Sequence, residues 1–231
     1  MGKKRWPFRL LLVKRYGRFR LSWPTRVSLT RIVLIVPFVI CMLHINDAER
    51  TAQTRALLRY TAIVIYCVMA LSDALDGYLA RRLGEVTQLG AFLDPLADKL
   101  LITSACLLLV SPRSHVDGFL LPPTVVVVII GKDLFLVIGF VIVYLITSQV
   151  RVAPVFAGKL ATALQFVMIA GVLLAPEISR VVPAWRWVLS VLWWSAVVTA
   201  ILATLIYIRK GSHYVEQYEQ RGAQDTSDRP P

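Results

Sequence analysis

Four aspartates stand close together in an otherwise apolar part of the chain, and they are the residues best suited to do chemistry. They occur in the stretch SDALDGYLARRLGEVTQLGAFLDPLADKL, as Asp73, Asp76, Asp94 and Asp98. An ionised carboxylate at bilayer depth is costly, so such residues usually mark a functional site. Four carboxylates in one place also repel one another unless a cation lies among them. The simplest such cation is a bound divalent metal.

The spacing of the aspartates predicts two carboxylate pairs on two helices. Asp73 and Asp76 are three residues apart and Asp94 and Asp98 are four apart, so each pair shares one helix face. The segment RRLGEVTQLGAF between them contains two glycines, which can break or bend the chain. We therefore expect two helices joined at the cytoplasmic side, with the two carboxylate pairs facing each other.

Such a cluster suits the transfer of a phosphate-containing group. Carboxylate oxygens are hard ligands for Mg²⁺ or Mn²⁺, and two such ions about 4 Å apart can hold the attacking and leaving oxygens of a phosphoryl displacement. Gly77 would let a ligand approach the backbone closely, and Arg81 can pair with a phosphate. Asp98 is the candidate general base, a carboxylate placed to take a hydroxyl proton. A solvated salt bridge would explain any one of these residues, but not all of them at this spacing.

The composition indicates a membrane protein. The chain has 231 residues, of which 57% are hydrophobic, and a mean hydropathy of +0.64, whereas soluble domains are usually less apolar. We expect one all-α integral membrane domain rather than a soluble helical core. Apolar runs between charged or proline boundaries predict six transmembrane helices, at roughly 26–46, 57–80, 93–111, 123–147, 157–175 and 185–208.

The charge pattern predicts the topology and a lipid partner. The net charge is +12, and the hydropathy favours an anionic membrane over nucleic acid as its partner. Residues 1–24 are predicted to form a basic amphipathic segment on the membrane surface, or only a basic tail that keeps the N-terminus cytoplasmic. The membrane domain would span 25–210. Positive residues place both termini and the active site at the cytoplasmic side of the cell membrane.

Two smaller expectations concern the tail and the cysteines. Residues 211–231 form a polar C-terminal tail, predicted to be disordered from about Arg221. Cys41, Cys67 and Cys106 lie in apolar runs, so we expect core residues rather than disulfides or metal ligands.

The stretch from Asp73 to Asp98 has the pattern D-x2-D-G-x2-A-R-x8-G-x3-D-x3-D. It resembles the motif of the CDP-alcohol phosphatidyltransferase family at every specified position, and the family also has six helices, with the motif on the second and third. The resemblance implies that all four aspartates hold two Mg²⁺ or Mn²⁺ ions and that Asp98 is also the base. It places the cytidine diphosphate part of the donor at Gly77, Arg81 and Thr87.

The resemblance implies an enzyme of phospholipid biosynthesis that transfers a phosphatidyl group from CDP-diacylglycerol to an alcohol and releases CMP. The runs FLDPLADK and AGKLATALQ are similar to phosphatidylglycerophosphate synthases and to cardiolipin synthases of this family. The favoured acceptor is glycerol 3-phosphate and the alternative is phosphatidylglycerol, with inositol phosphate and serine less favoured. Family members often form homodimers, which makes a second copy an expected partner.

Two hypotheses that assign the protein to other functional classes compete with the enzyme hypothesis. A small cation transporter would carry acids near mid-bilayer in broken helices of both halves, but here the acids cluster in one half. A structural lipid-binding scaffold would leave the four aspartates without a purpose.

Basic residues further along the chain are candidates for binding the acceptor. We expect Lys132, Arg151 and Lys159 to meet an acceptor phosphate, although Arg151 and Lys159 also fit as topology-setting residues. Lys132 and Asp133 lie within the fourth predicted helix. As neighbours they are expected to point to different faces, so that they are not simply one ion pair. Their GKD sequence is closer to cardiolipin-type members than to the arginine-glutamate common in phosphatidylglycerophosphate synthases.

The start of the first predicted helix carries two more candidates. Thr30 and Arg31 resemble a threonine-arginine start in relatives, and we expect them near the donor. The alternative is that they only cap and anchor the helix.

Overall fold

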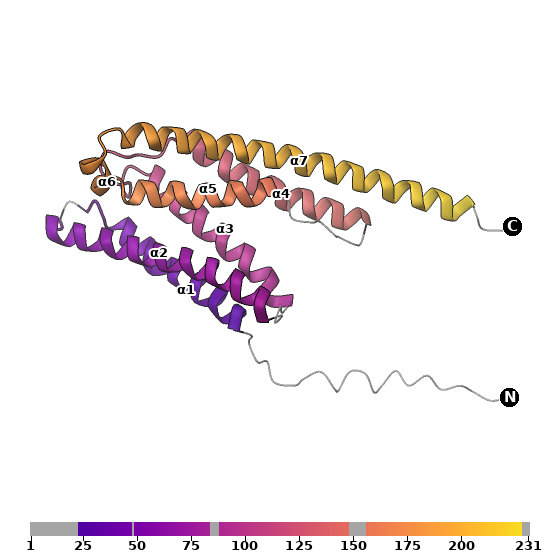
Figure 1. Cartoon of the computed structure of the whole chain (residues 1–231), viewed down its shortest axis with the longest axis horizontal. Coiled ribbons are helices and arrows are strands. Elements are labelled where there is room, and N and C mark those ends of the chain that lie inside the picture. Colours follow the sequence, from indigo (N-terminus) through magenta and orange to yellow (C-terminus); the bar gives the residue numbers. More distant parts are fainter. Residues whose placement is uncertain (1–22, 48, 84–87, 148–155, 228–231) are drawn as a thin grey trace, which may run out of the picture.

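The chain folds as a bundle of long helices (Figure 1). The computed structural model describes residues 23–47, 49–83, 88–147 and 156–227, with side chains from 26 to 212 except 48, 73–92, 94, 140 and 143–156. Every named element in these ranges is an α-helix, which confirms the all-α prediction for this part of the chain. The helices are α1 (Trp23–Leu43), α2 (Ala52–Leu83), α3 (Gln88–Val110), α4 (Pro123–Thr147), α5 (Phe156–Leu173), α6 (Ala175–Val181) and α7 (Trp185–Ser227).

Helix boundaries follow the apolar runs and the prolines that interrupt them. α4 has the predicted bounds, and it begins at a proline, whose fixed φ and missing N–H suit the first turn of a helix. The fifth predicted helix, 157–175, corresponds to α5, and the short helix α6 follows it after a break at Leu174. α5 and α6 are bent by 74° relative to each other, with Pro176 in the first turn of α6, where its missing N–H costs no helical hydrogen bond.

α7 is longer than predicted. The apolar run predicted an end near residue 208 and disorder from about Arg221, but α7 is helical to Ser227. The prediction of disorder from Arg221 is therefore wrong. After Pro183 the next proline is Pro230, so the sequence contains no proline to end the helix earlier. In Figure 1 the C-terminal part of α7 extends past the other helices.

Two groups of helices meet at α3. α1 packs on α2 and α3, while α4 and α5 pack along α7, and α3 contacts both α4 and α5 (Figure 1). A second contact joins α2 to α5 through Tyr66. Its buried ring lies 6.1 Å from that of Phe38 and 6.3 Å from that of Phe166, and its hydroxyl donates to the Phe166 carbonyl at 2.8 Å. The hydroxyl is thus satisfied inside an apolar core.

Glycines allow α5 and α7 to approach closely. A Cβ added at Gly158 would lie 3.1 Å from the Tyr207 hydroxyl oxygen, and one at Gly171 would lie 3.1 Å from Cδ2 of Leu189. The indole N–H of Trp185 also donates to the Gly171 carbonyl at 3.2 Å. Small residues at such positions are typical of helix contacts in membranes, where close packing takes the place of a hydrophobic driving force.

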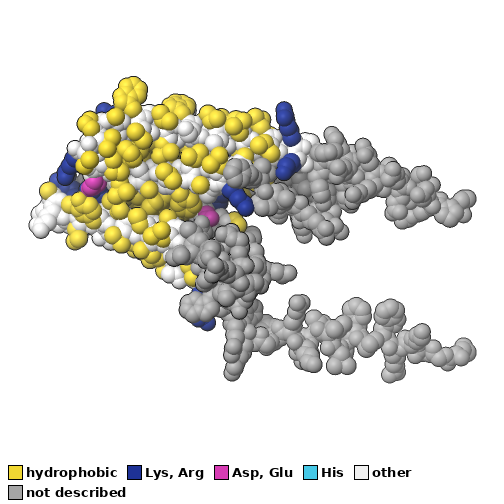
Figure 2. Space-filling view, viewed as in Figure 1, with side chains coloured by type: hydrophobic (Ala, Val, Ile, Leu, Met, Phe, Trp, Pro, Cys, Tyr) yellow, Lys and Arg dark blue, Asp and Glu magenta, His cyan; other side chains and the backbone are white. Residues whose placement is uncertain are grey.

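The described surface is that of a membrane protein. Figure 2 shows apolar side chains over the middle of the described body, with Lys and Arg gathered towards its two ends. Among the described residues, three segments are long and apolar enough to cross a bilayer, Arg26–Leu43, Ala52–Ser72 and Trp185–Ser212, and the bent pair of α5 and α6 would be a fourth. The six predicted transmembrane helices are therefore not confirmed, because the described residues provide only three or four candidates.

Two of the three cysteines lie in the core, as predicted, and the third packs against it. Cys41 and Cys106 are buried, Cys67 is partly buried, and all three are free thiols.

A polar cluster connects the first half of α2 to the short helix α6. The guanidinium of Arg59 donates to both carboxylate oxygens of Glu177, one through Nη1 at 3.3 Å and the other through Nη2. The Tyr60 hydroxyl donates to the same carboxylate at 3.1 Å. A bidentate, partly buried pair of this kind fixes geometry better than a single exposed contact. It holds the bend between α5 and α6 against the start of α2.

We predict that Glu177→Gln lowers stability by about 1–3 kcal/mol, because Arg59 then loses a charged partner in a partly buried place. The measurement is the midpoint of thermal unfolding in detergent. Arg50→Gln is the control, since its pair with Asp47 at 3.4 Å is exposed on both sides and should contribute at most about 1 kcal/mol. Equal shifts in the two variants would contradict the role given to Glu177.

Candidate functional site

The four aspartates lie on the two helices that the spacing predicted. Asp73 and Asp76 are in the C-terminal part of α2, and Asp94 and Asp98 are in the first half of α3. The side chains of the first three lie outside the described residues, so the facing carboxylate pairs stay a prediction. The same holds for the expected donor contacts, since the surroundings of Gly77, the Arg81 side chain and all of Thr87 are outside the described part.

Asp98, the candidate base, pairs with an arginine of the first helix. Nη1 of Arg31 donates to Oδ1 of Asp98 at 2.8 Å, and the Arg31 side chain is almost completely buried. The Asp98 side chain is 19% exposed, so the carboxylate lies at the edge of the interior. A buried guanidinium requires an opposite charge, and its rigid fork orients the carboxylate it meets. Arg31, which was expected near the donor, therefore lies against the candidate base Asp98.

Thr30 lies on the exposed side of α1. Its hydroxyl donates to the Arg26 carbonyl at 2.9 Å. Since α1 begins at Trp23, the alternative that Thr30 caps the helix is wrong. The threonine lies well inside the helix, where hydroxyls commonly bond back to the preceding turn.

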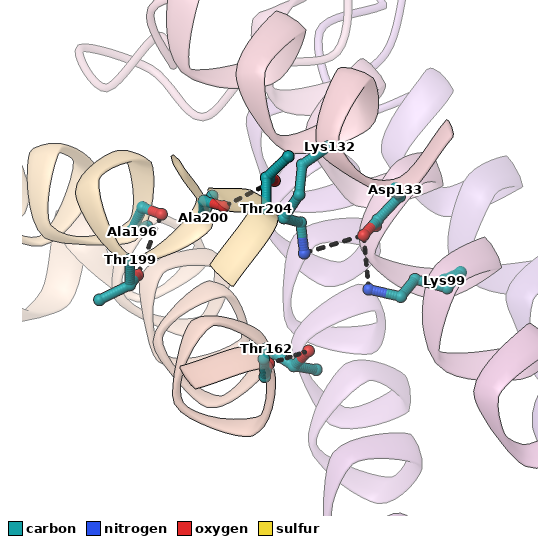
Figure 3. A network of polar contacts seen from close by, with 9 residues as sticks. Lys99, Lys132, Asp133, Thr162, Ala196, Thr199, Ala200 and Thr204 are labelled. Carbon is teal, nitrogen blue, oxygen red and sulfur yellow. Dashed lines mark hydrogen bonds and ion pairs between the residues drawn. The ribbon is translucent and has the colours of Figure 1, made fainter. Parts of the chain in front are cut away.

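A second ionic cluster links α3 to α4 (Figure 3). Nζ of Lys99 donates to Oδ1 of Asp133 at 2.6 Å, and Nζ of Lys132 reaches the same oxygen at 2.8 Å. Lys132 and Asp133 therefore contact each other, contrary to the expectation that they point to different faces, and Lys99, which was not predicted here, forms a second ion pair with the same carboxylate oxygen. A lysine has a long, flexible stem, so its ammonium group can reach the side chain of the next residue.

The three members of this cluster differ in exposure. The Lys132 side chain is 3% exposed, Asp133 is 12% exposed, and Lys99 is 34% exposed. The second oxygen of Asp133, Oδ2, is buried and has no hydrogen-bond partner among the described residues. One carboxylate therefore faces two ammonium groups. The cluster of Lys99, Lys132 and Asp133, called the Lys99 cluster below, has a surplus positive charge.

Lys99 was not predicted as a site residue. It directly follows the candidate base and is the only basic residue in the α3 sequence. A charge within an apolar helix usually faces a site, so this signal was present. The partner could not be found by spacing, because Asp133 lies 34 residues away on another helix.

The remaining acceptor candidates have different placements. Lys159 lies near the start of α5 and is exposed, whereas Arg151 lies outside the described residues. Two threonine hydroxyls drawn in Figure 3 bond within their own helices: Thr162 donates to the Gly158 carbonyl at 3.1 Å, and Thr204 donates to the Ala200 carbonyl at 2.9 Å.

Gln165 is a buried polar residue of α5 that was not predicted as a site residue. Its side chain is fully buried, and neither amide atom has a partner among the described residues. A buried amide of this kind can gain hydrogen bonds from a water molecule or a polar ligand group.

The chemistry of the aspartates fits a divalent cation. Among the described side chains no group of three or more His, Cys, Asp or Glu residues is close enough to hold a metal, but three of the four aspartates fall outside that set. A donor set made only of carboxylates suits a hard ion such as Mg²⁺ or Mn²⁺. Asp98 can take part despite its pairing with Arg31, because an ionised carboxylate has about four acceptor positions.

Residues 21–207 match the sequence model of the CDP-alcohol phosphatidyltransferase family. This range contains Arg31, all four aspartates and the Lys99 cluster. The chain belongs to the CDP-alcohol phosphatidyltransferase family. The resemblance seen in the motif is therefore confirmed over most of the chain.

Two relatives carry the same name. A CDP-diacylglycerol–glycerol-3-phosphate 3-phosphatidyltransferase of Bacillus subtilis is 36% identical over 154 residues, which are 65% of this chain and 76% of the relative. A protein of the same name from Escherichia coli K12 is 32% identical over 155 residues, 67% of this chain and 78% of the relative.

We predict that Arg31→Met lowers stability by up to about 4 kcal/mol, because it leaves Asp98 without its guanidinium partner in a largely buried place. Arg186→Met is the matched control, since this exposed arginine donates to the Gly118 carbonyl rather than to a carboxylate. The measurement is again the thermal unfolding midpoint. The double variant Arg31→Met/Asp98→Asn should be less destabilised than the sum of its parts. Additive effects would contradict a direct pairing.

Proposed function

We propose that this protein transfers the phosphatidyl group of CDP-diacylglycerol to glycerol 3-phosphate, forming phosphatidylglycerophosphate and CMP. The observation that carries the proposal is the complete Asp73–Asp98 motif in a chain similar to relatives named for this reaction. The Arg31–Asp98 pair and the surplus positive charge of the Lys99 cluster support it, because the first orients a base and the second attracts an anion.

In the proposed reaction Asp98 takes the proton of the acceptor hydroxyl. The oxygen forms a bond to the phosphorus next to diacylglycerol, the bond from that phosphorus to the CMP oxygen breaks, and CMP leaves with the electron pair. Arg31 keeps the Asp98 carboxylate in position for the proton transfer. Gly77, Arg81 and Thr87 would contact the cytidine diphosphate part of the donor.

The four aspartates would hold the divalent cation, Mg²⁺ or Mn²⁺, with two ions as the proposed number. When bound, the metal would neutralise the charge that develops on the leaving phosphate. Binding of the metal would also offset the repulsion among the four carboxylates, which otherwise destabilises the site.

The proposed setting is the cell membrane, with six transmembrane helices and the site at the cytoplasmic side. Support comes from the apolar described surface and from Arg209 and Lys210 on α7, which follow the last apolar run. An anionic lipid surface and a second copy of the chain are the proposed partners, in addition to the two substrates.

Phosphatidylglycerol is the second candidate acceptor, favoured by the aspartate that follows Lys132. A phosphomonoester such as glycerol 3-phosphate carries nearly two negative charges at neutral pH, whereas the diester of phosphatidylglycerol carries one. A cationic cluster attracts the more highly charged group more strongly. This difference favours glycerol 3-phosphate.

We predict that the purified protein in detergent, given CDP-diacylglycerol and Mg²⁺, releases CMP with glycerol 3-phosphate. Chelation of the metal with EDTA should stop the release, and added Mg²⁺ or Mn²⁺ should restore it. CMP release with phosphatidylglycerol alone would identify a cardiolipin synthase instead. A folded protein that releases CMP with neither acceptor would contradict both candidates.

We predict that Asp98→Asn lowers kcat by at least about 100-fold, because the amide cannot take the hydroxyl proton. The variant keeps the size of the side chain, and its unfolding midpoint reports whether the fold is preserved. Turnover like that of the wild type would rule out Asp98 as the base.

A further inference from the structure

The Lys99 cluster contains two ammonium groups that share one carboxylate oxygen. Lys99 Nζ and Lys132 Nζ lie 2.6 Å and 2.8 Å from the same Oδ1 of Asp133. One negative charge cannot neutralise both cations, and an uncompensated charge in a low-dielectric interior is costly. The cluster therefore has an electrostatic reason to attract a further anion.

The exposures decide which lysine meets that anion. The Lys132 side chain is only 3% exposed, so its charge depends on the ion pair with Asp133. If Lys132 left Asp133 to meet a ligand, this pair would be lost. Lys99 is 34% exposed and belongs to a different helix. An ammonium group has three donors, and the Lys99 stem is flexible enough to offer them to a ligand while Asp133 stays with Lys132.

The position of Lys99 suits one small acceptor. Lys99 directly follows Asp98, so their Cα atoms are about 3.8 Å apart, while consecutive helix residues point in different directions. The Asp98 side chain turns towards α1 and the Lys99 side chain towards α4. Adjacent residues of α3 thus offer a proton acceptor and a phosphate-binding cation, as an acceptor with a hydroxyl at one end and a phosphate at the other requires.

We propose that Lys99 binds the phosphate of the acceptor and that Asp133 is the positioning residue that aims it. The proposal rests on the proposed function and deepens it, because Lys99 rather than the more deeply buried Lys132 becomes the cation that selects a phosphorylated acceptor. Asp133 acts through the two lysines. It orients the ammonium group of Lys99 and neutralises Lys132, so that the net surplus charge is carried by the more exposed residue.

The test compares kinetic constants of the full-length protein for both substrates. Lys99→Met should raise the KM for glycerol 3-phosphate by at least about 10-fold and change the KM for CDP-diacylglycerol by less than about 2-fold. Lys99→Arg should recover part of the loss, because it restores the charge. Lys210→Met is the control for loss of one positive charge, since Lys210 is exposed on α7, and it should leave both KM values unchanged.

Glycerol in place of glycerol 3-phosphate separates phosphate binding from a general loss of function. If Lys99 binds the acceptor phosphate, Lys99→Met should lower kcat/KM for glycerol 3-phosphate much more than for glycerol. An equal loss with the two acceptors, or a rise in the donor KM as large as that of the acceptor, would overturn the proposal. A full effect from Lys132→Met with none from Lys99→Met would overturn it as well.

Asp133→Asn tests the positioning role. It should raise the KM for glycerol 3-phosphate, and adding Lys99→Met should then cost less than it costs in the wild type. Additive effects would show that Asp133 does not act through Lys99. If Asp133→Asn fails to fold, thermal unfolding of the wild type and Lys99→Met with and without glycerol 3-phosphate tests the lysine contact instead. A smaller ligand-induced shift in Lys99→Met supports the contact, and an equal shift overturns it.

The wild-type protein separates this proposal from the proposed function. If the wild type releases CMP with phosphatidylglycerol only, the proposed acceptor is wrong. The Lys99 variants are then compared with phosphatidylglycerol and CDP-diacylglycerol. A rise confined to the phosphatidylglycerol KM would support phosphate binding by Lys99, and an unchanged value would overturn it.

Discussion

A charged side chain inside an apolar bundle needs an opposite charge nearby, and this requirement decides how α3 is held. Asp98 finds its counter-charge in Arg31 of α1, and Lys99 finds it in Asp133 of α4. Removing Arg31 or Asp133 leaves a largely buried charge, on Asp98 or on Lys132, whose desolvation costs several kcal/mol. The two groups of helices are therefore joined at α3 by ionic contacts as well as by packing.

The two ionic contacts differ in charge, and this gives them different uses. Arg31 and Asp98 form a pair without net charge, which suits a carboxylate that must keep a fixed orientation. The Lys99 cluster has one cation more than its carboxylate can balance, which suits a place that receives an anion. The neighbouring positions of Asp98 and Lys99 bring these two environments together on one turn of α3.

Much of the fold could be predicted from the sequence, because apolar runs and prolines act locally. α4 begins at its proline as expected, and the aspartates lie on the two helices that their spacing indicated. Contacts between helices are different, since they depend on how each helix is rotated relative to its neighbours. Spacing within α3 therefore gave no indication that Lys99 meets Asp133. The length of α7 was underestimated because hydropathy marks where an apolar run ends, not where a helix does.

The side chains of Asp98 and Lys99 contact different helices, and this limits how α3 can move. Rotation of α3 about its axis would draw one side chain away from α1 or the other away from α4, and sliding along its axis would lengthen both ion pairs at once. A single inserted residue between Asp98 and Lys99 would turn the two groups about 100° relative to each other. A length change within this turn would therefore break at least one of the two ion pairs, whereas a substitution at an exposed position of α3 leaves both in place.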